Sequence, residues 1–382
     1  MKNKVAVVGA GLIDFGVLYD KSPDMMMEEA YINALQSVDN GIEPQEIQAA
    51  WLGTLRGRFT GVTLAHPTGL FNIPVSRVEN ACATGNDAFR HACFAIAAGV
   101  YDKAIVIGYE KMHDEKGGLI KLAAIKDIWM RRARSMPSFF ALRGTRHMHQ
   151  YGSTKEDFAL VSVKNRHNGS LYPHAHFKKE VTFEQVMKAP IISWPLGLFD
   201  CCPTTDGAAA VIVCKADLAK NYTDTPVYVA GSGLSVDSWI LGEAESLAGF
   251  PASKEASRQA FEMAGLEPKD IDVGEIHDCF SVTEILNYED IGFCEKGQGH
   301  KLIQEGVTAL DGEKPMNPSG GLLAKGHPIG ATGVAQIAEI YEQLRGEAGK
   351  IQVKDAGVGL THNIGVGRDN TGSVSCVHIL TR

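Results

Sequence analysis

The chain has 382 residues, 45% hydrophobic and 21% charged, with 37 Lys and Arg against 45 Asp and Glu and a net charge of −8. This composition is typical of a folded protein of two or three domains, or of one large α/β unit, and excludes a disordered chain. The acidic balance disfavours nucleic-acid binding, and the longest apolar run, Gly207–Cys214, is far shorter than the roughly 20 residues that span a membrane.

Short segments rich in Val, Ile and Ala predict strands that alternate with helices. In chain order the predicted strands are Val5–Val8, Ala50–Leu52, Arg77–Asn80, Ala104–Ile107, Ala209–Val213, Val227–Ala230, Val273–Ile276 and Ser373–Leu380. The predicted helices lie near Met25–Ser37, Asn86–Ala98, Glu255–Ala264, Val282–Ile291 and Gly333–Leu344. This alternation predicts an α/β fold with buried sheets.

Three short motifs occur twice in the same order. They are VAVVGAG and VYVAGSG at Val5–Gly11 and Val227–Gly233, GIEPQEIQAAW and GLEPKDIDVGE at Gly41–Trp51 and Gly265–Glu275, and ATG at Ala83–Gly85 and Ala331–Gly333. An ordered set of repeats indicates duplication. We therefore expect two similar halves, residues 1–222 and 223–382.

A basic segment interrupts the first half. Residues Lys116–Lys179 contain 13 Lys and Arg but three acidic residues, a net charge of +10, and five of the 13 histidines. The segment is either a solvated insertion or a surface that attracts a polyanion, such as a nucleotide with several phosphates.

The eight cysteines contain no CxxC pair, so we expect free thiols in a reducing cytoplasm and no metal site. The glycines of Gly9–Gly11 are followed by Leu12, Ile13 and Asp14, which breaks the GxGxxG pattern of dinucleotide-binding proteins.

Cys82, in RVENACATGNDAF, is predicted to lie where a strand turns into a helix. The dipole and free N–H groups of a helix N-terminus stabilise a thiolate, which would lower the pKa of this thiol. A structural cysteine is the alternative at such a position.

Three further segments offer polar groups. His327 lies in a Gly-rich loop, NPSGGLLAKGHPIGATG, before a predicted helix, and the repeat places this loop opposite the Cys82 loop. EIHDCFSVTEI ends a predicted strand with His277, Asp278 and Cys279, and Gly359–Gly367 is predicted to be a Gly-rich loop. Cys82 and His327 would then form a nucleophile–base pair.

Together these motifs resemble the thiolase superfamily over nearly the whole chain. The resemblance rests on NACATG around Cys82, HDCF at His277–Phe280, GHPIGATG at Gly326–Gly333 and the C-terminal Gly-rich segment. HDCF, in place of the commoner NEAF, is similar to sterol-carrier-protein-type and archaeal-type thiolases. The resemblance implies two five-stranded mixed-sheet halves stacked αβαβα, with a loop domain at about residues 113–190 that binds coenzyme A.

The resemblance also implies reversible acyl transfer between thioesters. Cys82 would attack a 3-oxoacyl-CoA, and His327 would take its proton. His277 would complete one oxyanion hole, and the backbone N–H groups of Cys82 and Gly365 would form a second. Asn363 replaces the CxG cysteine of most thiolases, so Cys279 becomes the expected acid/base at the α-carbon, with His277 and His362 as competitors.

Coenzyme A is expected as a substrate rather than a resident cofactor, with its phosphates near Arg131, Arg132 and Arg134. The expected partners are a second copy of the chain, as a homodimer, and a small protein with an OB fold and a zinc ribbon. A decarboxylating ketoacyl synthase-like enzyme and an inactive scaffold subunit remain alternatives. Five aromatic residues either line an acyl pocket or belong to the core, namely Trp129, Phe139, Phe140, Trp194 and Trp239.

Overall fold

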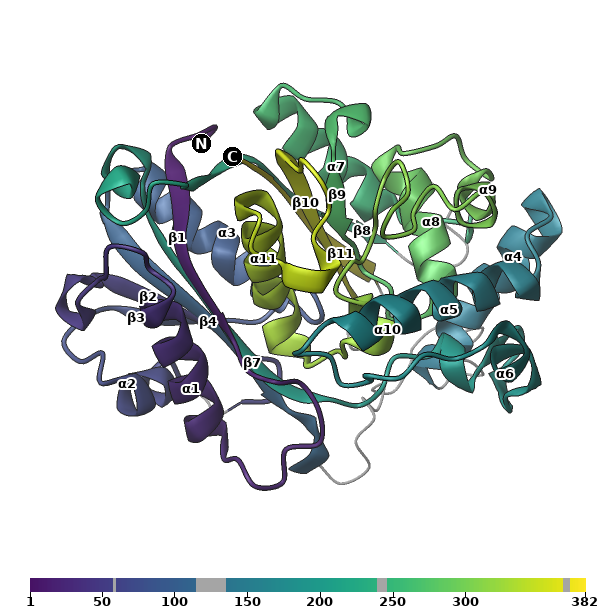
Figure 1. The fold of residues 1–382 in the computed structure, drawn as a ribbon, viewed down its shortest axis with the longest axis horizontal. Coiled ribbons are helices and arrows are strands. Elements are labelled where there is room, and N and C mark those ends of the chain that lie inside the picture. Colours follow the sequence, from purple (N-terminus) through teal and green to yellow (C-terminus); the bar gives the residue numbers. More distant parts are fainter. Residues whose placement is uncertain (58–59, 115–134, 239–245, 367–371) are drawn as a thin grey trace.

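Strands and helices alternate through two halves of the chain that repeat the same order (Figure 1). The computed structural model describes residues 1–57, 60–114, 135–238, 246–366 and 372–382. The first half contains β1 (Val5–Leu12), α1 (Pro23–Gln36), β2 (Ala49–Gly53), α2 (Val62–Thr68), β3 (Val75–Val78), α3 (Thr84–Ala97), β4 (Lys103–Lys111) and β7 (Asp206–Lys215). The second contains β8 (Val227–Ser238), α7 (Pro251–Ala264), β9 (Val273–Glu275), α8 (Ser281–Ile291), α9 (Gly299–Gln304), α10 (Gly321–Ala324), α11 (Ile329–Arg345), β10 (Val358–Val366) and β11 (Gly372–Thr381).

The main strands form one mixed sheet in the order β3-β2-β4-β7-β1-β8-β11-β10-β9. In the first half β3, β2 and β4 are parallel, whereas β4, β7 and β1 are antiparallel. The second half repeats this with β9 parallel to β10, and with β10, β11 and β8 antiparallel. A bridge between Gly274 and Met316 stands where the repeat of β3 would lie. The topology therefore shows the duplication that the repeats predict.

Within this sheet the strands of each half form one layer, and helices lie outside and between these two layers, which gives five layers in all. Helices α3 and α11 lie between the strands of the two halves, while α1 and α7 cover the outer faces (Figure 1). Along β1, Val5 and Val7 enter the apolar core around α3 and α11, whereas Ala6 and Val8 enter the core beneath α1. Alternation of this kind is what a strand covered on both faces requires. The predicted α/β class is confirmed. Within the described ranges, every helix falls short of the length and apolar character that a membrane crossing requires.

The two central helices cross with their backbones in contact. An ideal Cβ on Gly85 would lie 2.8 Å from the Val334 nitrogen, and one on Gly333 would lie 2.2 Å from the Asn86 nitrogen. A side chain at either position would push the helices apart, so this crossing requires glycine. Because these glycines end the two ATG repeats, the repeats meet at the crossing.

The prediction of a loop at Gly359–Gly367 is wrong for most of its length. Residues up to Val366 form strand β10, which pairs with β11 and β9, and Gly367 lies outside the described residues. The strand escapes detection because it carries polar residues, of which His362 and Asn363 are fully buried and have internal hydrogen-bond partners. The sequence of a strand covered on both faces need not alternate between polar and apolar residues.

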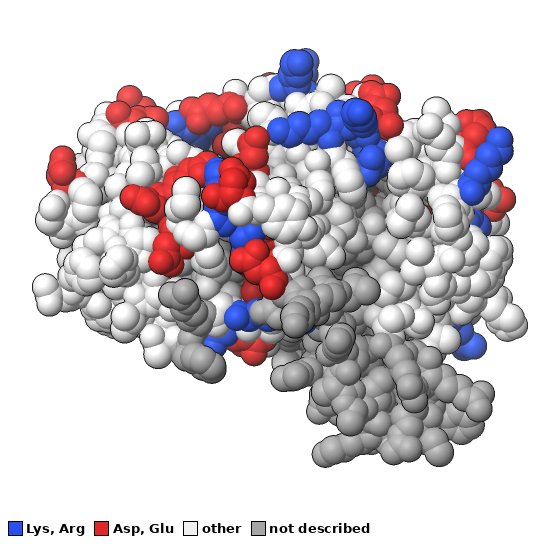
Figure 2. Space-filling view, turned by 90° about the horizontal axis from the view of Figure 1, so that it is seen from below, with Lys and Arg blue, Asp and Glu red and all other residues white. Residues whose placement is uncertain are grey.

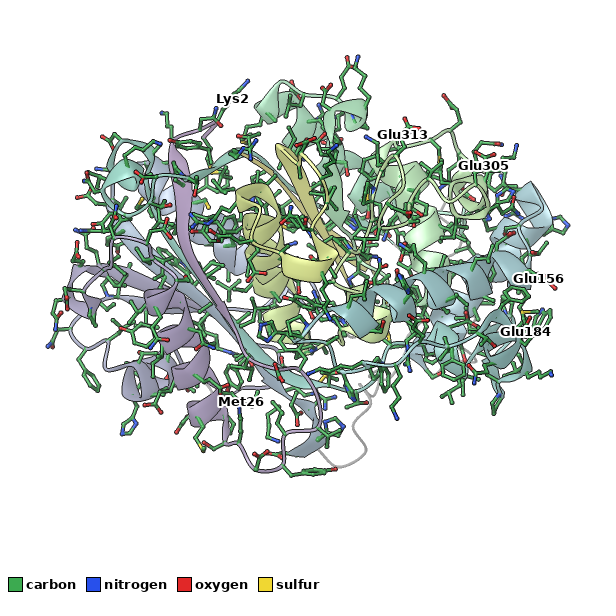
Figure 3. The ribbon with its side chains drawn as sticks, viewed as in Figure 1. Lys2, Met26, Glu156, Glu184, Glu305 and Glu313 are labelled. Atoms are coloured by element: carbon green, nitrogen blue, oxygen red, sulfur yellow. The ribbon has the colours of Figure 1, made fainter. Side chains whose placement is uncertain are left out.

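An inserted segment leaves the first half after β4 and returns at β7. Its described elements are α4 (Met136–Tyr151), α5 (Lys155–Leu171), α6 (Phe183–Lys188), β5 (Ile191–Ser193) and β6 (Leu196–Gly197). Helices α4 and α5 pack on α8, and α5 also packs on α10. Glu156 on α5 and Glu184 on α6 lie at the far end of the molecule from β1 (Figure 3). Acidic and basic side chains are intermixed among the described residues on the face in Figure 2.

The glycine crossing predicts a specific stability loss. Gly333→Ala places a methyl group against the Asn86 nitrogen, so we expect the free energy of unfolding to fall by at least ~1–3 kcal/mol. Gly16→Ala is the control, because a Cβ there meets nothing within 4 Å, and it should change stability by less than ~0.5 kcal/mol. Urea unfolding monitored by circular dichroism measures both. Equal midpoints for the two variants would contradict the close crossing.

Candidate active site

Cys82 lies in a tight turn between β3 and α3. Ala81, directly before it, has φ +49°, a conformation that costs a non-glycine residue about 1–2 kcal/mol. Thr84 holds the turn, because its hydroxyl donates to the Ala81 carbonyl at 2.6 Å and accepts the Asn80 N–H at 2.8 Å. The cysteine is thereby fixed two residues before the first helical residue, and 8% of it is exposed.

Burial gives the Cys82 thiol a high proton affinity. It raises the pKa of Cys82 to about 12, and the negative charges of Glu110 and Glu79 add to the effect. The helix N-terminus was predicted to lower this pKa, but loss of hydration outweighs the dipole at a site this dry. Cys82 therefore rests as a thiol and needs a base to act as a nucleophile.

His327 lies two residues before α11, and Thr332 holds its ring in one orientation. Thr332 Oγ1 donates to the Pro328 carbonyl at 2.9 Å and lies 2.7 Å from His327 Nδ1. A hydroxyl has one proton, so Nδ1 must donate to Thr332, and Nε2 must be the unprotonated ring nitrogen. Nε2 is buried without a hydrogen-bond partner among the described residues. Burial, reinforced by the charge of Lys325, lowers the pKa of His327 to about 3, so the ring is neutral at physiological pH.

The two loops that carry Cys82 and His327 meet at the helix crossing. Ile329 packs against Cys82 and Met112 in one small apolar cluster. Glu110 on β4 ties the halves together by accepting the N–H groups of Leu55 at 2.9 Å and Gly330 at 3.2 Å. The start of α11 is thus anchored to the half that carries Cys82.

His277 faces His327 from the end of β9. The two ring centroids are 5.4 Å apart and the planes are nearly perpendicular. Burial, followed by the neighbouring rings of His327 and His362, holds the pKa of His277 well below its usual value. The His277 backbone N–H donates to His362 Nδ1 at 3.4 Å, and His362 Nε2 lies 2.9 Å from Ser253 Oγ. His277 is therefore a second neutral imidazole beside His327.

Cys279 is a buried thiol in the same region. It is 5% exposed, and its Sγ lies 4.0 Å from Thr283 Oγ1. Its pKa is raised well above the usual value by burial first and then by the adjacent Cys202 and Cys82 sulfurs. The Cys202 N–H donates to the Cys279 carbonyl at 3.0 Å, which holds this turn. Cys279 and Cys82 thus share one buried environment.

Gly365 approaches the Cys82 turn from β10. An ideal Cβ on Gly365 would lie 2.5 Å from the Asn80 carbonyl oxygen and 3.0 Å from the Ala81 Cβ. Asn363, on the same face of β10, donates its amide to Gln336 Oε1 at 2.7 Å, toward the central helices. His362 lies on the opposite face and contacts α7 through Ser253. The structure therefore brings Cys82, His277, Cys279, His327 and Gly365 into one region.

Other predicted residues lie elsewhere or outside the described ranges. Phe139 and Phe140 are both 1% exposed and belong to the core, where Phe140 stacks on Phe280 at 4.7 Å. Trp194 is 59% exposed. Five predicted residues lie outside the described ranges, namely Trp129, Arg131, Arg132, Arg134 and Trp239. Within the described ranges, no group of three His, Cys, Asp or Glu side chains could hold a metal ion.

Sequence reasoning missed the side chains that position the site. Thr84 and Thr332 hold the Cys82 turn and the His327 ring, and Glu110 joins the two halves. A signal for the threonines was available, because each is the central residue of an ATG repeat. Glu110 has no such signal, since its partners are the Thr54 hydroxyl and backbone N–H groups, all distant in sequence.

Comparison with known proteins agrees with this architecture. Residues 5–217 match the family "Thiolase, N-terminal domain", and residues 200–382 match "Thiolase C-terminal domain-like". Among solved structures, "Ltp2-ChsH2(DUF35) aldolase" superposes with a TM-score of 0.85 at 23% identity and covers 100% of this chain and 98% of that one. That similarity concerns the fold.

Relatives in sequence are similar over nearly the whole chain. "Acetyl-CoA acetyltransferase" of Methanothermobacter thermautotrophicus is 44% identical and covers 99% of both chains. "Sterol carrier protein 2" of Bos taurus is 38% identical over 96% of this chain and 71% of its own length. "Benzoylsuccinyl-CoA thiolase subunit BbsB" of Thauera aromatica is 34% identical over 96% of both. The chain therefore belongs to the thiolase family of coenzyme A-dependent acyltransferases.

Proposed function

We propose that this acyltransferase works through a Cys82 acyl-enzyme with His327 as its base. The observation that carries the proposal is the His327 tautomer, whose buried Nε2 is unprotonated and lacks a partner. A neutral base beside a protonated thiol is the resting state of a nucleophile–base pair. Because burial disfavours both the thiolate and the imidazolium, proton transfer should accompany attack on the substrate rather than precede it.

In the degradative direction the Cys82 sulfur forms a bond to the ketone carbon of a 3-oxoacyl-CoA while its proton passes to His327 Nε2. The bond between the former ketone carbon and the α-carbon of the departing thioester then breaks. The carbanion of the departing thioester takes a proton from Cys279. The sulfur of coenzyme A next forms a bond to the acyl carbon, and the bond from that carbon to the Cys82 sulfur breaks. The coenzyme A thiol proton passes to the Cys279 thiolate, and His327 returns its proton to Cys82. Claisen condensation is the same sequence in reverse. The relatives named acetyl-CoA acetyltransferase favour a short acyl group.

The nearby rings and backbone would stabilise the negative oxygen atoms of these steps. We propose that His277 and His327 bind the thioester oxygen of the departing group, since their rings adjoin each other. The backbone of Gly365, pressed against the Cys82 turn, would join the Cys82 N–H in a second oxyanion hole. Donors of this kind each contribute about 3–4 kcal/mol to the rate.

Cys279 is the best-placed group for proton transfer at the α-carbon. Both nitrogens of His362 are engaged, and the ring contacts α7. The Asn363 amide cannot exchange a proton as an acid or base near neutral pH, and it points toward Gln336. Cys279 instead shares the environment of Cys82. A proton-exchanging group at this place favours thiolysis over decarboxylative condensation, which needs none, and CO2 release from a malonyl thioester would favour the latter.

We propose a homodimer formed through β3. This strand ends the described sheet, and no described strand pairs with its outer edge. Val62 and Phe71, on the segments that lead into β3, are 72% and 59% exposed. An edge strand flanked by exposed apolar side chains is a surface that a second copy can extend.

A small OB-fold, zinc-ribbon protein is a further proposed partner, since one relative is named a thiolase subunit. The eight cysteines are unpaired, which supports a cytoplasmic location.

The nucleophile and base can be tested with acetyl-CoA. Cys82→Ala should form no acyl-enzyme, and His327→Ala should form it ~100–10,000-fold more slowly. Because the pKa of His327 is lowered to about 3, the acylation rate should not fall as the pH passes from 8 through 6.5 to 5. Rapid quench and mass spectrometry of the intact protein measure this rate. Cys376→Ala, a buried cysteine on β11, is the control and should be acylated like the parent. An acid limb near pH 6.5 that His327→Ala abolishes would contradict the neutral base.

The α-carbon acid/base can be separated from the nucleophile. Cys279→Ala should still be acylated at Cys82 but should lose the exchange of acetyl α-protons with D2O, by ~100–10,000-fold. Proton NMR of acetyl-CoA in D2O follows this exchange. Cys202→Ala removes the neighbouring thiol and should exchange like the parent. If Cys279→Ala exchanges normally while His277→Ala or His362→Ala does not, the acid/base is that histidine.

The basic inserted segment is the proposed site for the coenzyme A phosphates. Its described part adjoins the His327 loop, because the backbone N–H groups of His176 and Phe177 donate to the carbonyls of Lys325 and Ala324 at 2.9 Å.

If this charge attracts the phosphates, the KM for coenzyme A should rise with ionic strength, since salt screens the attraction. Charge reversal at Arg131, Arg132 or Arg134 should also raise it and leave acylation by a saturating acyl-CoA less affected. Lys254→Glu, an exposed reversal on α7, should leave the KM unchanged. If the KM for coenzyme A does not change with salt or with any of the three reversals, the charge of the inserted segment is merely solvated.

A further inference from the structure

Helix α5 of the inserted segment reaches the catalytic loops through buried polar side chains. Lys164, Asn165 and Asn168 are at most 9% exposed, whereas Glu156 on the same helix is exposed (Figure 3). Lys164 Nζ donates to the Met316 carbonyl at 2.7 Å, and the Asn168 amide donates to the Asn317 carbonyl at 2.9 Å. One face of α5 is therefore hydrogen-bonded to the segment that leads into α10 and His327.

Asn165 is the member of this face that touches the HDCF motif. Its Nδ2 donates to Asp278 Oδ2 at 2.7 Å and to Glu284 Oε2 at 2.6 Å. All three side chains are fully buried. A side-chain amide has two protons, so this nitrogen serves both carboxylates at once. Without this amide, the buried Asp278 and Glu284 side chains would each lose one hydrogen-bond donor. Leaving buried carboxyl oxygens without a donor costs stability.

Asp278 in turn fixes the start of α10. Its Oδ1 accepts the Leu322 N–H at 2.6 Å, and its Oδ2 accepts the Leu323 N–H at 3.3 Å. Gly321 has φ +58°, and an ideal Cβ there would lie 2.3 Å from Asp278 Oδ2, so only glycine permits this approach. The helix ends at Ala324, three residues before His327. The Asp278 carboxylate therefore connects the HDCF loop to the loop that carries His327.

We propose that Asn165 is a positioning residue for His327, acting through Asp278 and α10. The inference rests on the proposed role of His327 as the base. Asn165 fixes the Asp278 carboxylate, which fixes α10, so the inserted segment helps to set the place of the imidazole. A shift of about 1 Å in a catalytic group can reduce a rate by about 100-fold, so a remote amide can control this step.

The test replaces the amide with an apolar group of similar shape. In Asn165→Leu, the rate of Cys82 acylation by acetyl-CoA should fall by roughly 10- to 100-fold with little change in KM. The double variant Asn165→Leu/His327→Ala should be no slower than His327→Ala alone, because a residue that acts only through His327 has no effect once the ring is gone. Ser162→Ala is the matched control. It removes a buried hydrogen bond of 3.0 Å to Asp200 from the same helix, and it should keep the parental rate.

Two results would overturn the proposal. One is a parental rate in Asn165→Leu, and the other is an additional loss of similar size in the His327→Ala background. If Asn165→Leu does not fold, Asp278→Asn serves instead, since it keeps the size of the side chain but removes an acceptor, and it should show the same dependence on His327. A parental rate in His327→Ala would instead refute the proposed base. A slow His327→Ala beside a parental Asn165→Leu would refute only the positioning role.

Discussion

The contact between the backbones of α3 and α11 is the constraint on which the site depends. Each helix begins next to a loop of the proposed active site, Cys82 before α3 and His327 before α11, and the helices touch at Gly85 and Gly333. The separation of the two loops is thus set by helix geometry rather than by flexible side chains. Duplication explains how such a crossing arises. When one helix start is copied, the two copies supply both sides of the contact between α3 and α11. In each half the threonine of the ATG repeat holds its own loop.

A second theme is that the resting site carries little charge. The three buried histidines near Cys82 all have lowered pKa values, and the buried thiols have raised ones, with loss of hydration as the leading cause. Neutral groups in a buried site exert little electrostatic pull on the uncharged acyl group of a substrate. In the proposed mechanism they would respond strongly when an oxygen or carbon becomes negative, because a buried site screens charge weakly. In the proposed mechanism the arrangement would therefore favour the transition state over the bound substrate, which is the requirement for catalysis.

The sequence was most informative where chemistry and local geometry coincide. Cys82, His277, Cys279 and His327 each lie next to a strand or helix end that composition and glycine spacing mark, and the ATG repeats indicated that two of the loops would meet. Strand β10 was missed because both its faces are buried and its polar residues have internal partners. The contacts of Glu110 and Asn165 were equally hidden. Each joins segments more than 50 residues apart, so no local pattern records them. The direction of the Cys82 pKa was misjudged because burial is a tertiary property.

The inserted segment leaves and re-enters the sheet at one point. Lys111 at the end of β4 pairs with Asp206 at the start of β7, and the buried Asp206 carboxylate accepts from Lys111 Nζ at 3.0 Å and from the His113 N–H at 2.9 Å. Insertions whose ends are already adjacent change length at small entropic cost. The inserted segment can therefore change in length and sequence while the sheet of the two halves stays the same. The inner face of α5 limits that freedom, because any replacement must still support the His327 loop.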